Sequence, residues 1–350
     1  MKACVRPSAS GGIFKKFSAA KFILRMPRKI NLAIQLRIKM DILEYNDVDP
    51  LQVMHLTLLA LDFPFTPELV THMRRTDPRP FPCFTVNAVE NDLVLGQVGV
   101  FRLPMISTEG REDVGGVWAV STHPLHAGRG VASALLEEAH RRMRAAGLRF
   151  STLGTSRSGG AYRLYQKHGY VDMNIWATAL TRWETAHQPT RLRAQPAGEG
   201  GFDFVETIYQ NLAKEYLGFT WRHQPFVRLR DKVNLDDIWI IWENREPVGY
   251  VFARQENLLL KLDIQILRTD IHAVEVIAAV ASKMKTSYVQ VTLSRPSDIS
   301  GLQRAGWQVA HPNWEAFMVK PLVPDISADD AHCLFGIGTD RFLVSWLDVT

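Results

Sequence analysis

Residues 115–147, GGVWAVSTHPLHAGRGVASALLEEAHRRMRAAG, join a dense apolar stretch to a glycine pair and then to a long amphipathic run. The apolar stretch predicts a strand, and the glycines predict a loop. The run after the glycines has a helical period; its apolar face comprises Ala132, Leu135, Leu136, Ala139 and Met143. Gly147 supplies the stop signal. The stretch therefore predicts a strand, a glycine-rich loop and a helix, in that order.

A glycine-rich loop between a strand and a helix is suited to bind an anion. Gly128 and Gly130 allow the backbone to approach a ligand closely, and the helix N-terminus offers free N–H groups and the positive end of a dipole. Arg129 adds a positive charge. The pattern therefore predicts a phosphate ligand, although neither G-x-G-x-x-G nor G-x-x-x-x-G-K-[ST] fits the loop.

The neighbouring segments place this loop late in a sheet. The sequence before it predicts a strand over residues 42–45, a helix from Pro50 capped by Asp49, a helix at TPELVTHMRR and a hairpin with its turn at Glu90-Asn91-Asp92. The sequence after it predicts a strand at RFSTLGT, a short helix at GGAYRLYQKHGY and a last strand at NIWATAL. The loop thus follows a fourth strand, whereas a doubly wound sheet carries its phosphate loop after the first.

At this point the sequence resembles the GNAT superfamily of acetyl-CoA-dependent N-acetyltransferases. The family's loop pattern, Q/R-x-x-G-x-G/A, aligns with AGRGVA at residues 127–132, and its later pattern, N-x-x-A-x-x-L-Y-x-x-x-G-F/Y, aligns with SGGAYRLYQKHGY at residues 158–170. Two departures occur. Ala127 replaces the family's Gln or Arg, and Ser158 stands where Asn is usual, so the affinity for the coenzyme is in question rather than the fold.

The resemblance implies an α/β (α+β) fold, with a mixed, mostly antiparallel sheet flanked by helices and followed by a second GNAT-like domain. In the second half, EPVGYVFARQ echoes LVLGQVGVFR, but no glycine separates KLDIQIL from the helix at DIHAVEVIAAVASKMK. We therefore expect the second domain to be degenerate and to bind no coenzyme. The expected division is a basic tail over 1–39, a catalytic domain over 41–183, a linker over 184–201, the second domain over 202–322 and a docked C-terminal segment over 323–350.

The resemblance also implies roles for particular residues. The pyrophosphate of coenzyme A is expected on the backbone of the loop and helix start, with the pantetheine arm along the strand and a further contact near the second motif; the residues concerned are Ala119, Val120, Gly128, Arg129, Gly130, Val131, Ala132, Ser133 and Ser158. Tyr165 stands at the family's general-acid position, with a packed structural tyrosine as the competing interpretation.

The general base is less well defined by the sequence. Glu112 or Asp113 lies near the position where many family members place a carboxylate, and His123 with His126 offers a water relay instead. Gly115 and Gly116 are expected to form a bulged entry to the central strand, or else to relieve crowding.

The composition excludes several other classes of protein. The chain has 350 residues, 46% of them apolar and 22% charged, with no long uncharged apolar run, and its three cysteines lack the spacing of a disulfide framework or a zinc site. Residues 1–40 hold ten Lys or Arg and no acid, so the rest of the chain carries a net charge of −5. The basic tail is open to four interpretations: a targeting peptide, a nucleic-acid or membrane arm, a disordered tail, or an artefact of a start upstream of Met40.

The sequence therefore predicts a cytoplasmic enzyme that transfers an acetyl or other short acyl group from acetyl-CoA to an amine, without a metal. The alternative is a coenzyme A-binding sensor or pseudoenzyme without turnover. The acceptor stays open between a small molecule and a protein amine. No membrane partner is expected, binding of nucleic acid rests on the basic tail alone, and a homo-oligomer is left open.

Overall fold

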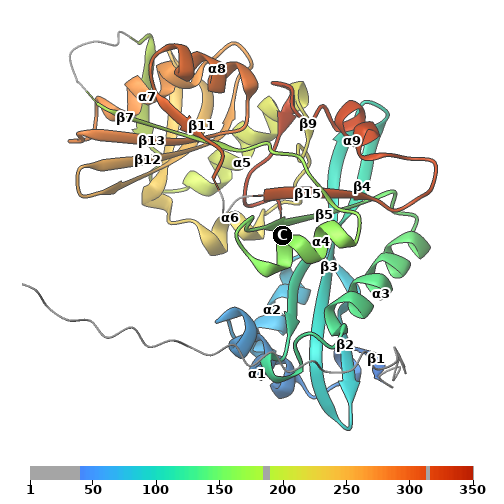
Figure 1. The fold of residues 1–350 in the computed structure, drawn as a ribbon. Coiled ribbons are helices and arrows are strands. Elements are labelled where there is room, and N and C mark those ends of the chain that lie inside the picture. The colour runs from blue at the N-terminus through green and yellow to red at the C-terminus, as the bar shows by residue number, and fades with distance from the viewer. Residues whose placement is uncertain (1–39, 184–189, 313–315, 350) are drawn as a thin grey trace, which may run out of the picture. The chain divides into compact units, whose positions relative to one another are not determined.

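The computed structural model describes residues 40–183, 190–312 and 316–349, which form two mixed, mostly antiparallel sheets with helices against them (Figure 1). The basic tail predicted over 1–39 lies outside the described residues. The first sheet contains, in spatial order, β1 (Asp41–Glu44), β2 (Pro80–Glu90), β3 (Leu93–Ser107), β4 (Gly110–Thr122), β5 (Phe150–Thr155), β15 (Ala316–Pro321) and β6 (Val171–Asp172).

Local sequence signals account for the elements of the first half. β2 and β3 form the predicted hairpin, and Asn91 and Asp92 take the positive φ angles that its tight turn requires. Asp49 caps the first helix with Pro50 in its first turn, as predicted. The helices are α1 (Pro50–Leu61), α2 (Pro67–Thr76), α3 (Val131–Ala145) and α4 (Gly160–Lys167).

The second sheet has its own set of helices. Its strands, in spatial order, are β14 (Gln308–Ala310), β7 (Ala177–Arg182), β13 (Tyr288–Leu293), β12 (Leu259–Leu267), β11 (Glu246–Glu256), β10 (Ile238–Glu243) and β8 (Leu192–Pro196). The helices are α5 (Gly201–Leu212), α6 (Val227–Lys232), α7 (Ala273–Ala281) and α8 (Pro296–Arg304). Short 3-10 helices are η1 (Tyr45–Asp47), η2 (Pro124–His126), η3 (Ala213–Glu215) and η4 (Leu235–Asp237).

The two sheets exchange strands. β7, the segment expected to end the first sheet, lies in the second sheet, antiparallel to β13 and β14. In return β15, from near the C-terminus, lies antiparallel to β5 and β6 in the first sheet, and Figure 1 shows this red strand beside the green β5. The stretch expected to be a linker contributes β8 to the edge of the second sheet. Each sheet is therefore completed by a strand from the other half of the chain.

The C-terminal residues pack into the body through strand pairing and a buried ion pair. α9 (Ala328–Phe335) is followed by β16 (Phe342–Leu343), which pairs in parallel with β9 (Leu217–Gly218). The guanidinium of Arg222 donates two hydrogen bonds to the carboxylate of Asp348, at 2.8 and 2.7 Å, and both side chains are buried. Because an unpaired buried charge is costly, this pair fixes the end of the chain against the second half. None of the described helices is long and apolar enough to span a bilayer.

Candidate functional site

β4 and β5 run parallel but pair over a short distance only. In the part of the chain that the structure describes, their register consists of Gly115 opposite Ser151 and Gly116 opposite Thr152. Beyond that point β4 continues along β3, while its other edge is no longer paired with β5. The two strands therefore part beside the middle of β4 and leave backbone there for an extended ligand to pair with.

The bulge in β4 lies further along the strand than the sequence analysis expected. Gly115 and Gly116 pair regularly with β3, whereas Ala119 and Val120 together stand opposite the single residue Val98. Ala119 has a φ of 50°, a left-handed conformation that is strained for a residue with a side chain. Gly115 instead relieves crowding, because a Cβ there would lie 2.5 Å from Sδ of Met143. The strained backbone thus falls at the two residues expected to pair with the pantetheine arm.

A buried hydrogen-bond chain holds the point where the strands part. Ser151 donates from its hydroxyl to the carbonyl of Gly115 at 3.1 Å, and its oxygen lies 2.7 Å from the hydroxyl of Tyr170. That hydroxyl lies 2.9 Å from Nε2 of His140 on α3. Burial, assisted by nearby cations of which Lys320 is the strongest, lowers the pKa of His140 to about 3. The imidazole is therefore neutral at ordinary pH and can act as a hydrogen-bond partner inside the core.

The predicted glycine loop has the geometry of an open helix start. Gly128 and Gly130 have φ angles of 78° and 82°, which residues with a side chain rarely adopt. Gly130 is the N-cap of α3 and makes no side-chain cap. Because the first turn of a helix leaves its N–H groups without intrahelical partners, the backbone from Val131 to Ser133 is available to an anion.

Arg129 is held by a carboxylate. Its guanidinium donates to both carboxylate oxygens of Glu90 on β2, at 2.9 Å each, and its second terminal nitrogen lies 2.6 Å from Nδ1 of His126. The sequence analysis assigned the charge of Arg129 to the phosphate. With that charge balanced by Glu90, the backbone donors and the helix dipole are the main attraction for an anion in the loop.

α4 carries Tyr165 and follows Ser158. Tyr165 is 6% exposed, packs against the ring of Tyr170 with 5.9 Å between centroids, and burial raises its pKa to about 12. The hydroxyl of Ser158 lies 2.9 Å from Ser156 Oγ. With its raised pKa, Tyr165 keeps its proton at any ordinary pH.

The predicted base residues lie at the other end of β4. Glu112 accepts two hydrogen bonds from Arg149, at 2.8 and 2.6 Å, and Asp113 lies between Arg102 and Arg111 at 3.8 and 3.7 Å. Asp113 precedes Ala119 by six positions, which corresponds to about 20 Å along an extended strand. The structure does not bring these carboxylates to the bulge.

An apolar cavity of about 630 Å³ adjoins the bulge. Ala119 and Trp118 form part of its wall, and the remainder comes from the end of α1, the segment after it, α2, Phe101 on β3, and α6 of the second half. The indole of Trp118 stacks on Phe101 with 4.9 Å between centroids, and it can lie flat on β3 because residue 99 is glycine: a Cβ there would be 2.3 Å from the indole nitrogen. The cavity therefore opens directly onto the strained part of β4.

The charged groups around the cavity are largely engaged with one another. Arg79 donates to both carboxylate oxygens of Asp77, at 2.8 and 2.6 Å. Burial alone would raise the pKa of Asp77, but these bonds to Arg79 hold it below its usual value. Asp231 on α6 faces His72 on α2, with 3.5 Å between carboxylate oxygen and Nε2. Arg228 donates to the carbonyl of Val349 at 2.6 Å.

Comparison with known proteins identifies a domain. The description "Acetyltransferase (GNAT) domain" matches residues 45–171, which contain the glycine loop, the parting strands and Tyr165. These residues therefore form a GNAT acetyltransferase domain. A comparison with curated proteins finds no match.

Solved structures share the GNAT fold over both halves of the chain. A probable N-acyltransferase from Enterococcus faecalis V583 is 14% identical, with a TM-score of 0.61 over 81% of this chain and 72% of that one. A GCN5-related N-acetyltransferase from Anabaena variabilis is 15% identical, with a TM-score of 0.57 over 81% and 73%. Eis1 from Mycobacterium abscessus is 16% identical, with a TM-score of 0.57 over 81% and 74%. At these identities the likeness concerns the fold alone.

The second half of the chain has no open helix start at the corresponding position. α7 follows β12 without a glycine, and the N–H of Ala273, its first residue, donates to the carboxylate of Asp298 at 2.9 Å. Arg295 and His272 face the same carboxylate at 3.4 and 3.5 Å. A carboxylate of the chain thus occupies the place where the first half leaves room for an anion. Among the described residues, no cluster of three or more His, Cys, Asp or Glu could hold a metal.

The residues that line the cavity were missed by the sequence analysis. The signal for them was the stretch LDFPFTP, residues 61–67, in which aromatic residues alternate with prolines between two amphipathic helices. Phe63 is 40% exposed there, an unusual position for a phenylalanine in a loop. The contribution of α6 has no signal in the sequence, because residues 227–232 meet this wall only through folding of the second half.

Proposed function

We propose that this GNAT protein transfers an acetyl group from acetyl-CoA to an amine by direct attack. The parting of β4 and β5 beside an uncapped helix start carries the proposal. The first feature leaves a strand edge for the pantetheine arm at Ala119 and Val120, and the second leaves backbone donors for the pyrophosphate at Gly128 to Ser133. Ser158, at the start of α4, supplies a hydroxyl for the coenzyme.

The same geometry supports acyl transfer in the adjoining cavity. The neutral amine attacks the thioester carbonyl and a C–N bond forms. The C–S bond breaks, the thiolate leaves with a proton from Tyr165, and the proton that the nitrogen sheds on becoming an amide restores the phenol through water. A backbone N–H of Ala119 or Val120 would polarise the carbonyl and stabilise the oxyanion. Since the hydroxyl of Tyr165 is protonated at ordinary pH, it is suited to the role of acid. Glu112 or Asp113 as the base stays a prediction from sequence.

A measurement of turnover distinguishes an enzyme from the alternative, a coenzyme A-binding sensor. Purified protein is titrated with acetyl-CoA in a calorimeter and then mixed with acetyl-CoA and a panel of amines, while free thiol is recorded. We expect one acetyl-CoA site per chain and amine-dependent thiol release. Binding without release for every amine would establish the sensor, and absence of binding would contradict both assignments.

A further inference from the structure

The lining of the cavity is apolar and rich in rings. Its apolar side chains are Leu61, Phe63, Phe65, Leu69, Met73, Phe101, Trp118 and Val227. The rings form a continuous series: Phe63 lies 5.1 Å from Phe65, Phe65 lies 5.0 Å from Trp118, and Trp118 stacks on Phe101 at 4.9 Å. Rings at these distances contact one another and form a continuous apolar wall, against which a ring or an apolar chain is favoured over water.

Part of this lining is left exposed at some cost to the free protein. Leu61 and Phe63, at the end of α1 and just after it, are each 40% exposed. Leu58 and Leu59, on the last turns of α1, are 46% exposed. Contiguous exposed apolar side chains beside a cavity are typical of a binding surface for an apolar group.

The charges around the cavity do not favour a polycation. The lining contains two carboxylates, Asp77 and Asp231, and two permanent cations, Arg228 and Lys232. Both oxygens of Asp77 are bonded to Arg79, and Asp231 faces His72. An acceptor with several ammonium groups would therefore meet no surplus of negative charge in the cavity, whereas a single ammonium group can lie against the aromatic faces.

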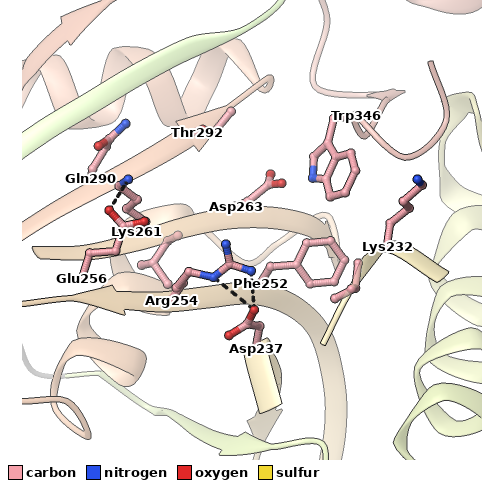
Figure 2. Close-up of a pocket in the computed structure, with 12 residues that line it drawn as sticks. Lys232, Asp237, Phe252, Arg254, Glu256, Lys261, Asp263, Gln290, Thr292 and Trp346 are labelled. Atoms are coloured by element: carbon pink, nitrogen blue, oxygen red, sulfur yellow. Dashed lines mark hydrogen bonds and ion pairs between the residues drawn. The ribbon is translucent and has the colours of Figure 1, made fainter. Parts of the chain in front are cut away.

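A second hollow, shown in Figure 2, provides the contrast. It has a volume of about 290 Å³ and lies on the second sheet, and half of its lining residues are charged, including the pairs Arg254–Asp237 and Lys261–Glu256. Neither Ala119 nor the parting strands border it. The apolar cavity is thus the one that meets the proposed acyl-transfer site.

From this lining we infer that the acceptor is a monoamine whose amino group is carried on an apolar, ring-containing body. The inference rests on the proposed function and specifies its acceptor. It selects an arylalkylamine over a polyamine, an aminoglycoside or a free amino acid. The body would lie among Phe63, Phe65 and Trp118, and the amino group would point to the bulge at Ala119.

The test compares two acceptors that differ by one ring. The full chain is assayed for thiol release with phenethylamine and with ethylamine, which carry the same kind of amino group, and with spermidine. Burial of the phenyl ring should make kcat/KM for phenethylamine about 10- to 100-fold higher than for ethylamine. A higher kcat/KM for spermidine or ethylamine would overturn the inference, and so would acetyl-CoA binding without turnover of any of the three.

Two matched variants test whether the preference for phenethylamine depends on the apolar cavity. Phe63→Ser removes a half-exposed ring at the cavity, and Phe204→Ser removes a ring of similar exposure, 37%, on α5 outside it. We expect Phe63→Ser to raise KM for phenethylamine about 5-fold or more and to raise KM for ethylamine less, while Phe204→Ser changes neither KM. Equal losses for both amines, or equal effects of both variants, would refute the inference. If the unmodified protein did not bind acetyl-CoA, that result would instead refute the proposed function.

Discussion

Tyr165 has a buried ring, and the role of its hydroxyl can be tested without disturbing its packing. Because burial raises its pKa to about 12, the proton is present throughout the pH range in which the protein would work. A thiolate has a pKa of roughly 8.5, so transfer to a fully formed thiolate would be uphill by about 5 kcal/mol. The phenolate must therefore regain a proton, and the attacking nitrogen sheds one as the amide forms.

We expect Tyr165→Phe to lower turnover about 10²-fold, the lower range for loss of general acid catalysis. The phenylalanine keeps the packing against Tyr170, so acetyl-CoA affinity and the urea midpoint should stay unchanged. Thiol release under saturating substrates measures the effect. Turnover within a factor of two of wild type would make Tyr165 a packing residue, and loss of acetyl-CoA binding would make its hydroxyl a coenzyme contact.

His140 makes the stability of the core depend on pH. Its folded-state pKa of about 3 lies below the 6.5 of an unfolded chain, so below pH 6.5 the unfolded state binds the extra proton. The stabilising contribution is complete above pH 6.5 and is lost as the pH falls toward 3. The cations that face the ring, Lys320, His168 and Arg144, act in the same direction as burial.

Urea unfolding at pH 6.5 and pH 5 should therefore show a loss of about 2 kcal/mol that is due to His140. In His140→Gln, which cannot titrate, this part of the pH dependence should disappear, although the variant is less stable at both pH values because the bond to Tyr170 is weakened. An unchanged slope in the variant would show that His140 is already protonated in the folded protein.

Backbone conformations in the short motifs were predictable from sequence, whereas partners distant in sequence were not. The positive φ angles of Gly128 and Gly130 follow from the local pattern. The ion pair between Arg129 and Glu90 joins residues 39 positions apart, and it depends on the register of β2 beside the loop. A sequence motif identifies possible hydrogen-bond donors, but only the fold shows which of them already bond to another residue.

At the scale of elements, the two ends of α3 allow a controlled test of the loop. Gly130 before the helix and Gly147 after it have φ angles of 82° and 77°, and a Cβ would meet nothing within 4 Å at either position. Valine should therefore strain the backbone equally at both, by about 1–2 kcal/mol. We expect Gly130→Val to abolish acetyl-CoA binding in calorimetry and Gly147→Val to preserve it. Equal affinity in the two variants would exclude the loop as the coenzyme site.

The kinds of element were predictable, but the position of an irregularity within one was not. Asp49 as a cap and the turn at residues 91–92 follow from local chemistry that the structure confirms. The bulge lies at Ala119 and Val120 instead of at the glycine pair, because a bulge is set by the pairing register with β3 and not by the residues that tolerate it best.

At the scale of the whole molecule, the strand exchange was beyond the reach of the sequence. Residues 177–182 and 316–321 each carry the pattern of a strand that ends a sheet, and the pattern contains nothing to show which sheet. The choice depends on contacts that exist only when both halves are folded. The predicted division of the chain near residues 183 and 202 stays a prediction about sequence units; the sheets themselves cross it.

A chain cut between the halves tests this dependence. Residues 40–183 alone lack β15, which leaves β5 and β6 without their shared neighbour, and residues 190–349 alone lack β7. Because exposed strand edges promote aggregation, we expect each fragment alone to be insoluble or to unfold without cooperativity, and the two co-expressed fragments to purify as one complex. A soluble, cooperatively folded 40–183 fragment would contradict this expectation.

The strand exchange also determines when the first sheet can be completed during synthesis. A ribosome that has just produced β6 must add about 150 more residues before β15 is available to lie between it and β5. At roughly 5–20 residues per second, the nascent first sheet lacks β15 for about 10–30 s, and the edges of β5 and β6 that pair with it stay unpaired. Domains commonly fold one after another as they emerge, but here the first sheet cannot close until β15, near the end of the chain, has been translated. Maturation of the transferase site is therefore tied to completion of nearly the entire polypeptide.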